Sequence, residues 1–159
     1  MKKIFVALLF SGILSGCDFS SKPPKNAELL IQETQKVFLH AKKFDFYESG
    51  RILVKDDNGV ALGRILYTDP LSAGAKGFRG PVPVMVFLDP ENEIVAVTLL
   101  PNEEDEPYLN RIADAGFFDC WKGISLNQAD SLKIDAVTGA TFSSNAIIQS
   151  VNVLLRNEK

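Results

Sequence analysis

RILVKDDNGVALGRILY, residues 51–67, is the stretch of sequence that decides the fold. Two apolar segments, 51–55 and 60–67, flank the tetrapeptide Asp56-Asp57-Asn58-Gly59. Asn-Gly between apolar segments is the strongest short signal for a β-hairpin, because both residues accept the positive φ angles of a tight turn. The chain is therefore expected to build an antiparallel sheet outward from this hairpin.

A second hairpin is predicted further along the chain. Its strands are residues 82–88 and 94–100, and its turn is Asp89-Pro90-Glu91-Asn92. Pro83 is expected at an edge or at the start of its strand, because proline cannot donate to a ladder. The glycine-containing segment 68–79 is predicted to be the loop between the two hairpins.

Helices are expected at both ends of this sheet. Apolar residues recur at helical spacing from Ala27 to about Lys43, and the final helix is predicted to begin near Ser143, with an apolar stripe of Ile147, Ile148, Val151 and Leu155. Between the hairpins and that helix we expect a short helix at 108–115, an aromatic turn at 117–123 and a brief strand at 134–137. The fold class is therefore α+β, with an N-terminal helix, an antiparallel sheet of two hairpins plus a late strand, and a C-terminal helix packed on the sheet.

The first residues indicate export and lipid attachment. Lys2 and Lys3 precede a short apolar segment that ends in Leu14-Ser15-Gly16-Cys17, an arrangement typical of a lipoprotein signal peptide. We expect residues 1–16 to be removed, Cys17 to carry acyl chains such as palmitate, residues 17–26 to form a tether, and residues 27–159 to form one domain. The alternative is an ordinary cleaved signal with a cysteine nearby. A lipidated protein would lie on the membrane, facing the periplasm or the cell exterior.

Composition excludes several classes of function. Without Lys2 and Lys3 the chain has 15 basic and 20 acidic residues, a net charge of −5, so nucleic-acid binding is not expected. His40 is the only histidine, so no histidine-based metal site or catalytic triad is predicted. With Cys17 lipidated, Cys120 has no partner, and we expect a buried structural thiol in preference to a redox thiol.

The stretch that carries chemistry is DAVTGATFSS, residues 135–144. Small residues form a tight turn before the final helix, and Gly139 and Ala140 allow another group to approach the backbone. Free N–H groups and the helix dipole favour an anion at such a place. The simpler interpretation is that one of three hydroxyls caps the helix, namely that of Thr141, Ser143 or Ser144.

The pattern Asp-x-x-Thr-Gly-Ala-Thr over residues 135–141 resembles the flavinylation motif of the FMN-binding domain family. This family includes the C subunit of the sodium-translocating NADH:quinone reductase and the G subunit of the Rnf complex. The resemblance implies that Thr141 bears FMN through a phosphoester, which a Mg²⁺-dependent flavin transferase installs from FAD. It places the aspartate of the motif on Asp135 and its first hydroxyl on Thr138, and with them we expect Gly139, Ala140, Ser143 and Ser144 to line the cofactor site.

Two further segments extend the resemblance. KGFRGPV, residues 76–82, resembles the family's KGYGGP-I segment and adds Gly77, Phe78 and Gly80 to the predicted cofactor site. The residues Phe117, Trp121 and Gly123 resemble the family's F..W.G element. Together the matching segments span about residues 50–156.

Two departures from the family pattern bear on the ligand. Where the family often has Glu-Thr-Pro-Gly, this chain has Asp105-Glu106-Pro107-Tyr108, and Tyr108 is predicted to stack on the flavin ring. Arg79 replaces a small residue between Gly77 and Gly80, where it either meets an anionic flavin or phosphate or stays in solvent.

The resulting hypothesis is a membrane-anchored flavoprotein that relays electrons with covalent FMN. Its expected partners are a flavin transferase and redox proteins, and it is not expected to be a self-contained enzyme, because no dinucleotide fingerprint is present. The alternatives are a domain that binds FMN or another phosphate ligand noncovalently, as a sensor or assembly subunit, and a structural lipoprotein that only retains the fold.

Overall fold

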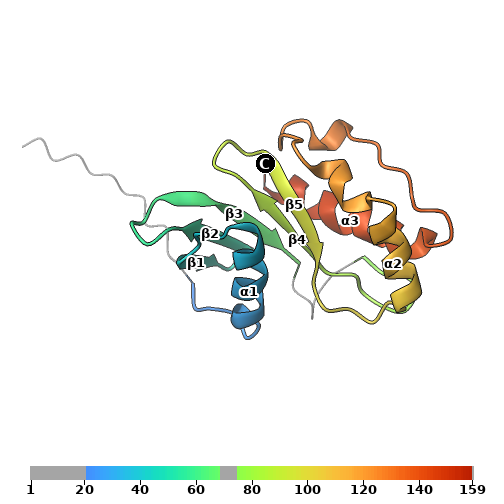
Figure 1. The fold of residues 1–159 in the computed structure, drawn as a ribbon, viewed down its shortest axis with the longest axis horizontal. Helices are drawn as coiled ribbons and strands as arrows, with labels where there is room; N and C mark the ends of the chain where they lie inside the picture. The colour runs from blue at the N-terminus through green and yellow to red at the C-terminus, as the bar shows by residue number, and fades with distance from the viewer. Residues whose placement is uncertain (1–20, 69–74, 159) are drawn as a thin grey trace, which may run out of the picture.

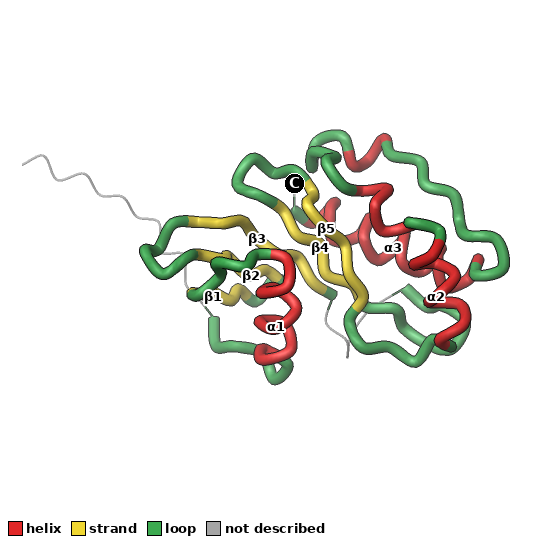
Figure 2. The backbone as a smooth tube through the Cα atoms, viewed as in Figure 1, coloured by secondary structure: helices red, strands yellow, loops and turns green. Residues whose placement is uncertain are grey.

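A computed structural model describes residues 21–68 and 75–158 of the chain. These residues form a five-stranded antiparallel sheet in the order β1-β2-β3-β4-β5, with helices against both faces (Figures 1 and 2). In chain order the elements are α1 (Ala27–Val37), β1 (Lys43–Tyr47), β2 (Arg51–Lys55), β3 (Ala61–Tyr67), β4 (Val84–Leu88), β5 (Ile94–Leu99), α2 (Glu106–Asp114), the 3₁₀ turns η1 (Phe117–Trp121) and η2 (Ala129–Ser131), and α3 (Thr141–Asn157). The predicted α+β class is confirmed.

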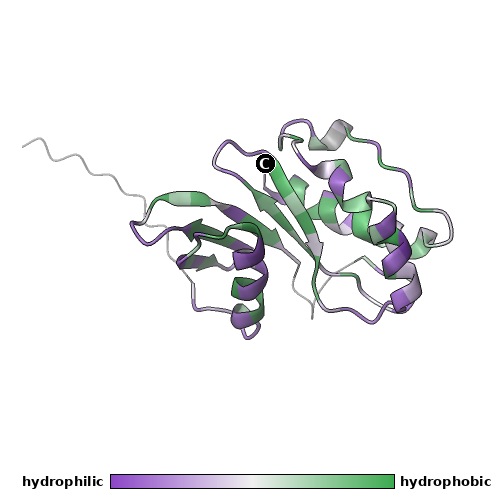
Figure 3. Cartoon of the chain, viewed as in Figure 1, coloured by the Kyte–Doolittle hydropathy of each residue, from purple (hydrophilic) through white to green (hydrophobic). Residues whose placement is uncertain are grey.

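Strand β4 is buried on both faces and joins two hydrophobic cores. Val84, Val86 and Leu88 point into the core beneath α3, whereas Met85 and Phe87 point into the core beneath α1. Successive side chains of a strand alternate between faces, so a strand covered on both sides needs apolar residues at every position. This explains why the segment is a continuous apolar run, and Figure 3 shows the hydrophobic residues gathered on the central strands.

Both predicted hairpins are present. β2 pairs with β3, with Arg51 opposite Leu66, and the intervening turn places Gly59 at φ +87°. β4 pairs with β5, and Pro83 lies immediately before β4, where no ladder donor is needed. The expected position of Pro83 at the start of its strand is therefore confirmed.

The N-terminal helix is shorter than predicted. Helix α1 ends at Val37, and a turn closed by a hydrogen bond from Ala41 N–H to Phe38 C=O (2.9 Å) leads into β1. Ala41 is an apolar residue at helical spacing from Leu30 and Val37, which is why the sequence pattern extends past Val37. It is buried although the backbone has already left the helix. His40, predicted to lie on this helix, lies exposed in the turn.

The fifth strand is β1, and not the late strand predicted at 134–137. Residues 43–47 pair with β2 over five positions, from Lys43 opposite Lys55 to Tyr47 opposite Arg51. Residues 134–137 run without a strand partner beside the first turn of α3, where the N–H of Val137 donates to Ser144 Oγ at 3.0 Å. The Ser144 hydroxyl of the following helix therefore supplies the hydrogen-bond acceptor that a neighbouring strand would otherwise supply.

The C-terminal elements cover the second face of the sheet. Ile147, Val151 and Leu155 of α3 are buried against it, as predicted, and Ile148 is half-buried. Helix α2 begins at Glu106, with Pro107 in its first turn, where the lost N–H costs nothing.

Cys120 is exposed, so the expectation of a buried structural thiol is wrong. In the tight turn η1 the side chains of Phe117 and Trp121 enter the core, which turns Cys120 outward.

The predicted leader, residues 1–16, and Cys17 lie outside the described residues, as does half of the loop predicted at 68–79, namely residues 69–74. Within 21–68 and 75–158 no helix is long and apolar enough to cross a membrane.

Candidate functional site

The loop before α3 has a conformation that only small residues allow. Gly139 lies at φ +80°, and the N–H of Ala140 donates to the carbonyl of Val137 at 3.0 Å. Ala140 precedes the helix without any side-chain cap, and Thr141 is its first residue. The helix therefore starts two residues earlier than the predicted Ser143, and Thr141 lies exposed at its N-terminus.

None of the three candidate hydroxyls caps this helix. Ser144 Oγ donates to Ala140 C=O (2.9 Å) and accepts from Val137 N–H, and Ser143 Oγ donates to the carboxylate of Glu104. The Thr141 hydroxyl has no hydrogen bond to another described residue. The capping interpretation is therefore wrong: two of the hydroxyls fasten the helix to other segments, and the third is free.

The first N–H groups of α3 are also free. Those of Thr141, Phe142 and Ser143 have no acceptor in the described part of the chain, and the first interaction belongs to Ser144 N–H, which donates to Ala140 C=O at 2.9 Å. Free N–H groups at the positive end of a 17-residue helix favour an anion.

Glu104 joins this helix to the glycine-containing loop of residues 77–80. Its carboxylate accepts from the N–H groups of Phe78 (3.1 Å), Arg79 (2.6 Å) and Gly80 (3.3 Å), in addition to Ser143. Burial alone would raise the pKa of Glu104, but these hydrogen bonds to the charged form outweigh it and lower the pKa below its ordinary value. Glu104 is therefore a buried carboxylate that remains ionised.

Gly77 is required by this close approach. A Cβ atom on Gly77 would lie 2.8 Å from Cδ of Glu104 and 2.8 Å from Cγ2 of Val82. The loop closes through Gly77 N–H, which donates to Gly80 C=O at 2.7 Å. Its geometry fixes Phe78 at the tip, above the start of α3.

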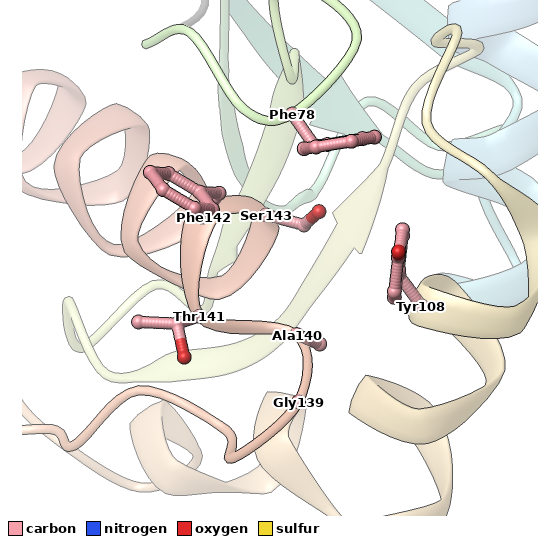
Figure 4. Close-up of a pocket in the computed structure, with 7 residues that line it drawn as sticks. All are labelled: Phe78, Tyr108, Gly139, Ala140, Thr141, Phe142 and Ser143. Atoms are coloured by element: carbon pink, nitrogen blue, oxygen red, sulfur yellow. The ribbon is translucent and has the colours of Figure 1, made fainter.

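A cavity of about 280 Å³ opens between this loop, α2 and α3 (Figure 4). Aromatic rings surround it: the centroid of Phe78 lies 5.6 Å from that of Tyr108 and 6.4 Å from that of Phe142. The other lining residues are Gly139, Ala140, Thr141 and Ser143. Phe142 is 70% exposed and Phe78 is 51% exposed, so a planar ligand would find apolar surface that the protein itself leaves uncovered.

Arg79 is held by a carboxylate. Its Nε donates to both oxygens of Asp105 at 3.1 Å, and its guanidinium lies 5.4 Å from the ring centroid of Phe78. Arg79 is exposed, in agreement with the expectation that it stays in solvent, and its charge is paired with Asp105.

The structure brings together most of the predicted site residues. Those at the cavity are Phe78, Tyr108, Gly139, Ala140, Thr141 and Ser143, while Gly77, Gly80 and Ser144 support it from behind. Thr138 and Asp135 are exposed and do not line the cavity.

Sequence reasoning missed Glu104 and Phe142. For Phe142 a signal existed, since it is a large apolar residue between hydroxyls at a helix start. For Glu104 no such signal existed, because it is one of several acidic residues in the segment 103–106.

The fold and the site are suited to a planar aromatic ligand with an anionic group, because an apolar cavity lies beside a helix N-terminus with free N–H groups. A model of the FMN-binding domain family matches residues 77–156, half of the chain, and the chain belongs to this family. The matched range contains the whole cavity, and its aromatic walls and free N–H groups fit FMN. A search of curated proteins finds no match to the chain.

Proposed function

We propose that this protein carries FMN covalently on Thr141 and relays electrons while anchored to the outer side of a membrane. The observation that carries the proposal is the position of Thr141: its hydroxyl is free and exposed at the start of α3, on the rim of the aromatic cavity of an FMN-binding domain. A phosphoester there would place the phosphate at the free N–H groups of the helix and the ring system among Phe78, Tyr108 and Phe142.

Within the described residues, no side chain is hydrogen-bonded to the Thr141 hydroxyl to activate it. The only histidine, His40, lies in the turn after α1, and the carboxylate of Glu104 is occupied by Ser143 and the 77–80 loop. Activation would therefore come from a flavin transferase and its metal ion. Thr141 Oγ would attack the FMN phosphorus of FAD, the bond to the AMP phosphate would break, and the hydroxyl proton would leave with AMP.

The cavity suits electron exchange with other proteins. Two of its aromatic residues, Phe78 and Phe142, are exposed, so a bound ring system would keep an edge in reach of donors and acceptors. When bound, FMN supplies the redox chemistry, and this chain's residues hold it and exclude water from one side.

The covalent link is tested by coexpression with a flavin transferase and flavin fluorescence in a denaturing gel. The wild-type protein should give a fluorescent band and gain the mass of FMN less one water. Thr141→Val, which keeps the shape but loses the hydroxyl, should give neither, and Thr141→Ser should retain both.

A dark wild-type band, with a control protein modified in the same cells, would overturn covalent attachment. Flavin that copurifies but is lost on denaturation would instead support the noncovalent alternative, in which the N–H groups of α3 hold the phosphate. Absence of flavin under both conditions would favour a structural role.

The lipid anchor on Cys17 is tested by fractionation. Cys17→Ala should move the protein from the membrane to the soluble fraction, because acyl chains supply the membrane affinity. Cys120→Ala removes the other thiol, which is exposed, and should remain in the membrane. A Cys17→Ala protein that stays membrane-bound would contradict the anchor.

A further inference from the structure

The arginine of α2 lies directly against the loop that presents Thr141. A Cβ atom on Gly139 would lie 2.1 Å from Nη1 of Arg111 and 3.1 Å from its Cζ. Gly139 therefore does more than adopt a positive φ angle: its missing side chain lets a guanidinium reach the backbone two residues before Thr141. Figure 1 shows α2 beside α3 at this end of the domain.

Arg111 has no carboxylate partner in residues 21–68 and 75–158. The ion pairs found there join Lys36 to Glu33, Lys55 to Asp45, Arg79 to Asp105, and Arg51 and Arg64 to Glu158. Arg111 is also exposed and donates no side-chain hydrogen bond in that part of the chain. Of the two arginines near the cavity, Arg79 is neutralised by Asp105 and Arg111 is not.

The unpaired guanidinium of Arg111 is complementary in charge to the phosphate of the proposed flavin. Arg111 lies against Gly139, two residues before Thr141, so a phosphodiester on Thr141 would bring a negative charge near this guanidinium. The N–H groups of α3 offer that charge hydrogen bonds, but they carry only the partial charge of a helix end. A guanidinium adds a full positive charge and a forked set of donors suited to phosphate oxygens.

We propose that Arg111 is a binding residue for the FMN phosphate, donating guanidinium N–H groups to the phosphodiester on Thr141. This inference rests on the proposed function. It makes α2 part of the phosphate site, and it gives Gly139 the second role of admitting the guanidinium.

The test compares the full chain in detergent with and without flavin, using Arg111→Gln, Arg111→Lys and the control Arg156→Gln. Arg156 is exposed near the far end of α3, so its variant removes the same charge away from the site. Arg111→Gln should lower the Tm of the flavinylated protein by about 3 °C more than that of the unmodified protein. Arg111→Lys should recover part of that difference, and Arg156→Gln should show none.

A second measurement reports on the phosphate itself. The ³¹P resonance of the attached FMN should shift in Arg111→Gln and stay in place in Arg156→Gln. If Arg111→Gln is too poorly flavinylated or folded to isolate, Arg111→Lys carries the same two comparisons, with smaller changes in the same direction.

Two results would overturn the inference alone. One is an equal Tm loss in the flavinylated and unmodified forms, which indicates a purely structural role, and the other is an unchanged Tm and ³¹P resonance. A wild-type chain that acquires no covalent flavin is a different result, because it overturns the proposed function and this inference with it.

Discussion

The hydroxyl of Ser143 donates a hydrogen bond to the carboxylate of Glu104, 39 residues earlier in the chain. The same carboxylate accepts N–H groups from the loop that carries Phe78, so a buried acid sets the distance between this loop and α3. The aromatic cavity lies between these two segments. Its shape therefore depends on a residue that does not line it.

Replacing this carboxylate should destabilise the domain. Glu104→Gln puts an amide NH₂ where backbone N–H groups need an acceptor, and we expect a loss of about 2–4 kcal/mol in the free energy of unfolding. The free energy of unfolding is measured by urea denaturation, with the fluorescence of the single tryptophan, Trp121, as the signal. The neighbouring Glu103→Gln is the control, since Glu103 is exposed, and a loss as large in this variant would contradict the prediction.

The hydrogen bonds to Glu104 also predict a pH dependence. Its pKa is lowered in the folded protein, so its contribution to stability is fully present above the ordinary pKa of 4.5 and is lost as the pH falls through the folded value. The stability difference between wild type and Glu104→Gln should therefore shrink as the pH falls below 4.5. Urea titrations at a series of pH values test this, and a difference that stays constant down to the acid transition would refute it.

Gly139→Ala should affect flavin attachment more than folding. The φ angle of +80° costs a side chain about 1–2 kcal/mol, and the new Cβ would push the flexible Arg111 guanidinium away from the motif. Gly59→Ala is a matched control, because Gly59 has a φ of +87° with nothing within 4 Å of the added atom.

The two glycine variants should therefore lose similar stability in urea denaturation, while only Gly139→Ala loses fluorescence in the denaturing gel after coexpression. Equal flavin attachment in both variants would show that the Gly139 loop tolerates the displaced guanidinium.

The sequence was sufficient for the parts of the fold that local pattern encodes. Asn58-Gly59 identified the first hairpin, and the stripe of α3 identified the face that it buries. β1 was missed because it is short and because buried Ala41 extends the helical spacing past the real end of α1. The extended segment 134–137 was predicted to be a strand, but the N–H of Val137 donates to Ser144 Oγ of the next helix and not to a neighbouring strand.

The site was predictable only where its residues are adjacent in sequence. Thr141 and Phe78 stand out in their own motifs, whereas Glu104 and Arg111 gain their roles from contacts made by folding. A glutamate in an acidic segment is normally exposed. Glu104 is buried because loop N–H groups 24 to 26 residues away converge on it, and no local pattern records that convergence.

The exposed ring of Phe142 gives a prediction that separates ligand binding from folding. Phe142 is 70% exposed and its ring centroid lies 6.4 Å from that of Phe78, so Phe142→Ala should change the stability of the unmodified protein by no more than about 0.5 kcal/mol. In the flavinylated protein the ring would gain a planar neighbour, and we expect a loss of about 1 kcal/mol.

Val153→Ala is the control, since Val153 is 53% exposed on the same helix and does not line the cavity. Thermal unfolding of both forms measures the two losses. A Phe142→Ala loss of equal size in both forms would contradict the prediction, because the ring would then stabilise the protein without its cofactor. A loss confined to the flavinylated form would mean that the cofactor is the packing partner of Phe142, which explains why α3 leaves this ring exposed.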